Sequence, residues 1–205
     1  MHASSSGVRT ATRLHPEQGA TLIELVLVMT LLVLVAAMAV PSTAQAIDAG
    51  RARLAAGFVA SRLRLARQDA IFKSRQIGAV FDWVGNRWLF SICADGNRNG
   101  IRRAEILAGV DACIEGPHDL QQRFQHIQIA VNPLLAGPEG SLASPDPVRF
   151  GPSDIASFSP AGSCTPGTLF IRSREGTQYA VRVGGATGRT RILRFETGTQ
   201  KWIDG

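Results

Sequence analysis

The sequence predicts an α+β protein in which one long N-terminal helix precedes a domain of antiparallel strands. Two observations carry this prediction. The first is a helical stretch that starts in an apolar run at Ala20 and continues, with apolar residues spaced by seven and four positions, to Phe72. The second is a change after Gln76 to a period of two, interrupted by turn residues at short intervals, which is typical of β structure.

Residues 20–40 form an apolar run with one carboxylate, Glu24, near its start. As a helix, this run extends about 31 Å at about 1.5 Å per residue, which matches the hydrocarbon core of a bilayer. We therefore expect residues 20–41 to form a single transmembrane helix. A carboxylate inside a membrane costs about 3 kcal/mol on insertion, so Glu24 is expected to meet a cation.

The preceding segment, residues 1–19, is polar and contains Arg9, Arg13 and Glu17. Basic residues ahead of a membrane span favour the cytoplasmic side, so the chain after Pro41 is expected outside the cytoplasm. A secretory signal would have a shorter apolar core and a small-residue cleavage site after it. A plain membrane anchor is the alternative interpretation, but it gives Glu24 no role.

The string Gly19-Ala20-Thr21-Leu22-Ile23-Glu24-Leu25 resembles the prepilin processing motif of type IV pilins and type II secretion pseudopilins. The resemblance implies that residues 1–19 are a leader peptide, cut between Gly19 and Ala20 by a prepilin peptidase that also methylates the amine of Ala20. Ala20 departs from the commonest first residue, phenylalanine. Glu24 is the fifth residue of the mature chain, where pilins use a glutamate in filament assembly. In a filament it would pair with the N-terminal amine of another subunit.

Residues 42–75 are expected to continue the helix as an amphipathic segment. We interpret its regularly spaced large apolar residues as the packing face, with small residues between them. The large ones are Ile47, Leu54, Phe58, Leu65 and Phe72, and the small ones are Ala52, Ala55, Ala66 and Ala70. The other face is basic, which most often means a solvated face. It carries Arg51, Arg53, Arg62, Arg64, Arg67, Lys73 and Arg75.

Residues 76–205 are predicted to form one β-rich globular domain with two small sheets packed behind the helix. A hairpin turn is expected at Val84-Gly85-Asn86, and residues 133–147, rich in Pro, Gly and Ser, are expected to be a loop. The predicted strands are 76–82, 87–93, 124–131, 148–150, 155–158, 168–172, 178–183 and 189–195.

The segment Asp95-Gly96-Asn97-Arg98-Asn99-Gly100 begins like a calcium loop. The twelfth position, where a bidentate acid belongs, is Ile106, and Glu105 comes one place early. Arg98, together with Arg102 and Arg103 just after the segment, would also repel a divalent cation. We therefore predict a polar turn between strands and no metal site.

The residues whose side chains could act in catalysis do not fall into any known enzymatic sequence motif. Two histidines lie in a polar region with several acids, and two nucleophile candidates follow, but no nucleophile elbow, zinc-protease motif or phosphate loop places them. We expect no catalytic residues, no cofactor and no enzymatic activity. The residues considered are Asp111, Glu115, His118, Asp119, His126, Ser163 and Cys164.

Three cysteines, Cys93, Cys113 and Cys164, would lie in an oxidising periplasm if the membrane topology is as expected. One disulfide with one thiol left over is the simplest expectation, and spacing leaves the pairing open. The cysteines have neither a C-x-x-C pair nor a histidine in a zinc-ligand rhythm.

The C-terminal string Gly188-Arg189-Thr190-Arg191, followed by Arg194, suggests an anion site. Strand alternation would place Arg189 and Arg191 on one face, where two guanidinium groups can clamp a phosphate. The string resembles the GRxR motif that is implicated in DNA capture in the FimT branch of the GspH/FimT-type pilins. The plainer alternative is a solvated hairpin in which these arginines pair with Glu175 or Glu196.

Taken together, the chain resembles GspH/FimT-type minor pseudopilins and type IV minor pilins. Two further segments add to the resemblance: residues 65–71, similar to an "LARxEAI" helix end, and residues 95–105, similar to a "DxNxxGxRxxxE" loop. The resemblance implies a pilin-like fold with a β-sandwich-like periplasmic domain, anchored by a single pass in the inner membrane. Implied partners are other pilins or pseudopilins, the prepilin peptidase and the inner-membrane assembly platform, with double-stranded DNA in the alternative function. The choice between a type II secretion system and a type IV pilus stays open.

The net charge of +6 is unevenly distributed along the chain. Basic residues dominate residues 51–103 and 161–205, whereas acidic residues dominate 104–160. A positive field over the helix and the C-terminal part favours phosphate binding that weakens as salt rises. Aromatic residues near the GRxR string are few, so contact with the backbone of a duplex fits better than base stacking.

Overall fold

The computed structural model of the chain describes residues 21–140 and 142–205, without the side chains of residues 38–42 and 139. The chain divides into two compact units, residues 1–42 and 43–205, and helix α1 (Leu22–Phe72) contributes to both. The predicted leader, with the cleavage and methylation positions Gly19 and Ala20, lies outside the described residues.

In the first unit, the described part of α1 is apolar except for Glu24 and Thr30. Its large apolar side chains between Leu22 and Val35 are each 48–83% exposed. Thr21 lies just before the helix, and its hydroxyl oxygen accepts a hydrogen bond from the backbone N–H of Glu24 at 3.3 Å, as an N-cap residue does. Within the described residues, no helix is long and apolar enough to cross a membrane. The span expected at residues 20–41, part of which is not described, stays a prediction.

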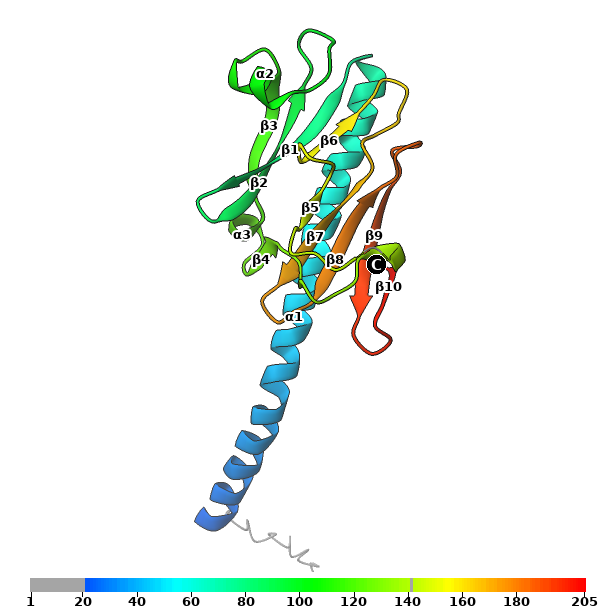
Figure 1. Cartoon of the computed structure of the whole chain (residues 1–205). Helices are drawn as coiled ribbons and strands as arrows, with labels where there is room; N and C mark the ends of the chain where they lie inside the picture. Colours follow the sequence, from blue (N-terminus) through cyan, green and yellow to red (C-terminus); the bar gives the residue numbers. More distant parts are fainter. Residues whose placement is uncertain (1–20, 141) are drawn as a thin grey trace, which may run out of the picture. The chain divides into compact units, whose positions relative to one another are not determined.

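The second unit contains two antiparallel sheets beside the part of α1 drawn in cyan in Figure 1. The first has the order β3-β2-β1-β6, and the second has the order β10-β9-β8-β7-β4 with β5 also pairing with β7. Their strands are β1 (Ile77–Val84), β2 (Arg87–Ala94), β3 (Ala112–Asp119), β4 (Ile127–Ile129), β5 (Val148–Arg149), β6 (Ile155–Phe158), β7 (Gly167–Ser173), β8 (Gln178–Val183), β9 (Thr190–Glu196) and β10 (Lys201–Asp204). The predicted fold class, an α+β chain with a helix before antiparallel sheets, is confirmed at this level.

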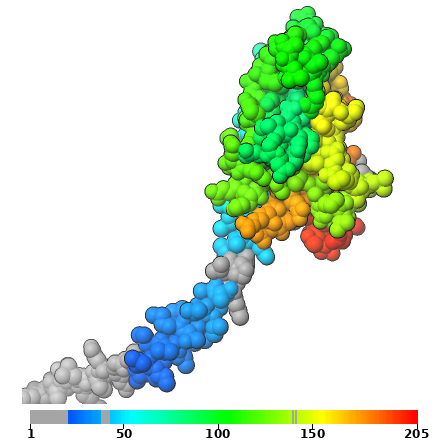
Figure 2. Space-filling model, turned by 60° about the vertical axis from the view of Figure 1, so that its left-hand side comes forward, coloured from blue at the N-terminus to red at the C-terminus, as the bar shows by residue number. Residues whose placement is uncertain are grey.

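Short helical segments interrupt the connections between strands: α2 (Arg103–Leu107), α3 (Leu120–Arg123) and the 3-10 turn η1 (Pro138–Gly140). In the view of Figure 2, the green loop between β2 and β3 lies at one end of this unit and the red turn between β9 and β10 at the other.

Two strands, β3 and β10, were not predicted from the sequence. Strand β3 contains Gly116 and Pro117, residue types that are depleted in strands. It lies at the edge of its sheet and pairs only with β2, and an edge strand tolerates proline because one side of its backbone needs no partner. Strand β10 has only four residues, too few for an alternating pattern to stand out.

The core is built from large side chains of the sheets and small side chains of α1. Phe81, Phe90, Phe150 and Phe158 are at most 1% exposed, and Phe81 stacks on Phe150 with ring centroids 5.5 Å apart. The helix buries mainly alanines in the same cluster, at spacings of three and four residues: Ala52, Ala55, Ala56, Val59, Ala60, Leu63, Ala66 and Ala70. Small side chains let the helix approach the sheets closely, so the strands supply most of the volume.

The prediction that the large apolar residues of α1 form its packing face is therefore wrong, whereas the small residues predicted between them are buried. Leu54 is 65% exposed and Phe72 is 86% exposed, and Phe58 is only partly buried. The sequence pattern contains two apolar stripes, and the domain uses the one made of small residues. We name the other stripe the α1 seam, which consists of Ile47, Leu54, Phe58, Leu65 and Phe72.

The cysteine arrangement is one disulfide and one free thiol. Cys93 of β2 and Cys113 of β3 lie directly opposite each other in the sheet and are joined. Cys164 is free and buried, and its thiol donates to the backbone carbonyl of Thr165. Burial raises the pKa of the Cys164 thiol to about 12, from an ordinary value of 9.0.

We expect Cys164 of the folded chain to resist alkylation by iodoacetamide at pH 8. The thiolate is the nucleophile, and the raised pKa keeps the thiol protonated at that pH. In guanidinium the same chain should take up one label, counted by mass spectrometry. Because the folded-state pKa lies above the unfolded one, the contribution of this thiol to stability is present below pH 9 and is lost as the pH rises towards 12. Rapid labelling of the native chain would contradict this account.

Candidate functional site

The GRxR string begins on a tight turn between β8 and β9 and continues into β9, which starts at Thr190. The N–H of Gly188 donates to the carbonyl of Gly184 at 2.8 Å, and the N–H of Gly184 donates to the carbonyl of Arg189 at 3.0 Å. Gly188 is buried with a φ of +60°, and a Cβ there would lie 2.5 Å from the carbonyl oxygen of Gly162 and 2.8 Å from Cδ of Arg67. Only glycine combines this backbone conformation with this lack of space.

Two arginines of α1 bond the chain around this turn, Arg64 at the start of β9 and Arg67 in the neighbouring loop between β6 and β7. Nη2 of Arg64 donates to the carbonyl of Thr190 at 3.4 Å, and Nε of Arg67 donates to the carbonyl of Gly162 at 3.1 Å. Between helix and turn lies a hollow of about 670 Å³, which we name the arginine groove. None of the seven described residues that line it is acidic. They are Arg64, Arg67, Gln68, Thr187, Gly188, Arg189 and Thr190.

Arg189 is the only one of the three predicted arginines that lines this groove. Arg191 instead donates through Nη2 to both carboxylate oxygens of Asp204 in β10, at 2.9 and 3.2 Å. The alternative interpretation paired the arginines with Glu175 or Glu196, whereas the acid that pairs with Arg191 is Asp204. The guanidinium of Arg191 is thus already matched by a carboxylate, although the pair is exposed and therefore weak.

Arg194 lies on the opposite face of β9 from Arg191, because three positions separate the two residues in a strand. It lines a different hollow, together with Glu175 and Glu196. The structure therefore places Arg189, Arg191 and Arg194 in three separate surroundings.

The Gly188→Ala variant is expected to destabilise this turn by about 1–3 kcal/mol, because an alanine there has an unfavourable positive φ and meets Gly162 and Arg67. Chemical denaturation of the full-length chain would measure the change. Gly198→Ala is the matched control, since a Cβ at that position meets nothing within 4 Å. Equal stabilities for the two variants would show that the turn does not need glycine.

The sequence was interpreted as giving α1 a solvated basic face. For Arg64 and Arg67 this interpretation is incomplete, because both side chains lie beside the turn and bond to backbone carbonyls there. The available signal was their spacing. Both residues directly follow buried positions, Leu63 and Ala66, so they emerge at the edge of the packed face of the helix.

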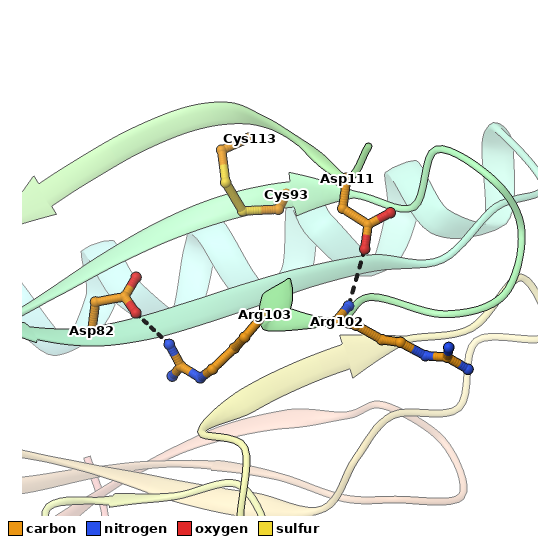
Figure 3. Close-up of a disulfide and its surroundings, with 6 residues drawn as sticks. All are labelled: Asp82, Cys93, Arg102, Arg103, Asp111 and Cys113. Carbon is orange, nitrogen blue, oxygen red and sulfur yellow. Dashed lines mark hydrogen bonds and ion pairs between the residues drawn. A yellow bond between two sulfur atoms is a disulfide. The ribbon is translucent and has the colours of Figure 1, made fainter. Parts of the chain in front are cut away.

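The loop between β2 and β3 is organised by two buried aspartates. The carboxylate of Asp95 accepts backbone N–H bonds from Asn97, Arg98 and Gly100 at 3.1, 2.6 and 2.8 Å. Asp111, shown in Figure 3, accepts from the N–H groups of Gly96 and Arg102, each at 3.0 Å. These carboxylates are thus engaged by the loop's own amides. Among the described residues, no cluster of histidine, cysteine or acidic side chains is placed to hold a metal ion.

Further contacts fix this loop to the sheet, as Figure 3 shows. The disulfide between Cys93 and Cys113 closes its base. Arg103 forms an ion pair with Asp82 of β1, and its Nε donates to the carbonyl of Ser153 at 2.8 Å. The calcium-like string therefore builds a rigid polar turn, with Arg103 as one of its anchors.

The residues considered for catalysis are distributed among packing contacts. Nε2 of His118 lies 2.8 Å from Oε1 of Glu115, and its ring packs beside the rings of Phe58 and Phe90. The hydroxyl of Ser163 is 2.7 Å from that of Ser159. In the described part of the chain, Ser163 bonds to Ser159 and Cys164 to Thr165 rather than to a histidine, so the geometry gives no nucleophile–base pair there.

Comparisons with protein-family models, with curated proteins and with solved structures gave no significant match.

Proposed function

We propose that this chain is a minor pilin or pseudopilin of the GspH/FimT type. In this proposal a prepilin peptidase removes residues 1–19, and residues 20–41 anchor the chain by a single pass in the inner membrane. The unit of residues 43–205 then lies in the periplasm. The subunit joins a type II secretion pseudopilus or a type IV pilus.

The observation that carries the proposal is the exposed α1 seam. Its residues recur at spacings of seven and four, which is the repeat of a helix that packs along another helix. Burial of one large apolar side chain contributes about 1.5–3 kcal/mol. The domain's own sheets occupy the alanine face of α1 and, of the seam, contact Phe58, so they leave Ile47, Leu54, Leu65 and Phe72 exposed for a second helix. Helices of neighbouring subunits in a filament supply such a partner.

Glu24 fits the same assembly. An unpaired carboxylate in an apolar environment is unfavourable, and the amine of Ala20 in another subunit would neutralise it. A filament thus satisfies two needs of the single chain, the apolar seam and the acidic side chain.

Incorporation into sheared filaments tests the proposal. We expect Glu24→Ala and Leu65→Lys to reach the membrane at parental levels, but to fall about tenfold or more in the sheared fraction, because each removes several kcal/mol of favourable pairing or burial. Leu107→Lys is the control, since Leu107 lies on α2 and is 89% exposed. Parental incorporation of both test variants would contradict the proposed assembly.

A second candidate function, DNA binding, is favoured by the arginine groove, which has three guanidinium groups and no acid in its lining. Contacts of this kind bind phosphates without sequence preference and weaken with salt. We expect the full-length chain in detergent to retard duplex DNA at about 50 mM salt and to lose this binding by about 200 mM. No retardation at the lower salt concentration would exclude this function.

A further inference from the structure

The arginine groove differs in membership from the GRxR string. Arg64 and Arg67 come from α1, Arg189 comes from the turn, and Arg191 does not line the groove. Arg191 is instead matched by Asp204. No ion pair of the described residues involves Arg64, Arg67 or Arg189. The groove therefore contains three guanidinium groups that no described carboxylate neutralises.

The two helix arginines are oriented before any ligand arrives. Each uses one N–H in a bond to a backbone carbonyl, Arg64 to Thr190 and Arg67 to Gly162. A guanidinium has five N–H donors, so most donors of both groups have no partner among these bonds. Arg64 and Arg67 lie three positions apart on the helix and so share a face with the groove.

The hydroxyl group of Thr190 is a second, independent observation that points to a ligand in the groove. Thr190 is 7% exposed, and its Oγ1 has no hydrogen-bond partner in the described part of the chain. It lies on the same strand face as Ile192, which packs on the core shared with α1. A buried hydroxyl without an acceptor is unfavourable, so a fold that keeps one beside three arginines suits a ligand that supplies an acceptor.

We propose that one phosphate group binds in the arginine groove, held by Arg64, Arg67 and Arg189 with the Thr190 hydroxyl as a further donor, and that Arg191 takes no part. A phosphate presents several oxygens in different directions, which suits guanidinium groups arriving from two elements. The identification of DNA as the source of this phosphate rests on the second candidate function. The phosphate site itself does not rest on it, because a free phosphate ion is recognised by the same contacts as a phosphate of DNA.

The first arm of the test uses inorganic phosphate and the full-length chain in detergent. Binding to the folded state raises Tm. We expect Arg64→Gln and Arg189→Gln to need about tenfold more phosphate for the same rise, as expected for loss of a charge-assisted hydrogen bond. Arg191→Gln should behave as the parent does. Thr190→Val should raise Tm in the absence of phosphate and weaken phosphate binding, because it removes an unpaired hydroxyl that only the ligand satisfies.

The second arm measures retardation of duplex DNA as a function of salt. Arg64→Gln should weaken binding and reduce the salt slope by about 1, whereas Arg191→Gln should leave both unchanged. Phosphate protection without DNA retardation would support the site and reject DNA as its ligand. Two results would overturn the proposal: no phosphate protection of the parent, or a loss in Arg191→Gln that Arg64→Gln does not share.

Discussion

The Leu63→Ala variant is expected to lose about 2–5 kcal/mol of unfolding free energy, the largest effect of any single change on α1. Leu63 is fully buried in the cluster that the helix shares with both sheets. Its truncation removes apolar contacts and leaves a cavity that a helix held on two sheets cannot close. Chemical denaturation of the full-length chain in detergent, followed by tryptophan fluorescence, would measure the loss.

Leu65→Ala is the matched control, because it changes the same residue type on the same helix two positions away. Leu65 is 48% exposed and belongs to the α1 seam, so its truncation should change the stability of the single subunit by less than about 1 kcal/mol. A larger loss for Leu65→Ala than for Leu63→Ala would mean that the two stripes of α1 have been assigned the wrong way round.

The second large effect is expected for Asp95→Ala, at about 2–4 kcal/mol. Asp95 is 3% exposed, and its carboxylate accepts three backbone N–H bonds from the loop between β2 and β3. Removal of the acceptor leaves these amides without their partner, which costs about 1–3 kcal/mol for a buried amide and less for the amides of the exposed residues Asn97 and Arg98. Faster hydrogen exchange at residues 96–111, with the disulfide intact, should accompany the loss.

Glu105→Gln controls for the change of charge in the same loop. Glu105 accepts bonds from the side-chain amides of Asn97 and Asn99, and a glutamine retains an acceptor oxygen for one of them. We expect a loss below about 1 kcal/mol. Parental stability of Asp95→Ala would show that other groups, rather than the buried carboxylate, hold the loop.

Much of the fold follows from patterns that are local in the sequence. Strands β6 and β8 were predicted at their observed bounds, 155–158 and 178–183, because alternating apolar residues are flanked there by turn residues. Strand β3 could not be predicted in this way. Its pairing depends on β2 and on the disulfide between Cys93 and Cys113, and neither is visible in its own eight residues.

The buried face of α1 shows a different limit. Large residues mark an apolar stripe more strongly than alanines do, so a pattern search selects Leu54 and Phe72 before Ala56 and Ala60. The phenylalanines of the sheets decide which stripe is buried, because they already fill the space and leave room only for small side chains. These phenylalanines are far from α1 in the sequence, so the pattern within the helix does not show which stripe is buried.

The sequence predicted some residues of the candidate site and not others. Gly188 and Arg189 were selected from the GRxR string, and their positions on a tight turn agree with the interpretation that glycines permit it. Arg64 and Arg67 were not selected, because the groove arises only when the turn packs on α1 more than a hundred residues away in sequence. The match of Arg191 with Asp204 likewise depends on the pairing of β9 with β10.

Mass spectrometry of the chain purified from cells that contain a prepilin peptidase tests the central claim most directly. The account predicts a mature polypeptide that begins at Ala20 with a methylated amine, and a Gly19→Val variant that keeps residues 1–19. A parental chain that retains its leader, or that begins at any residue other than Ala20, would contradict it.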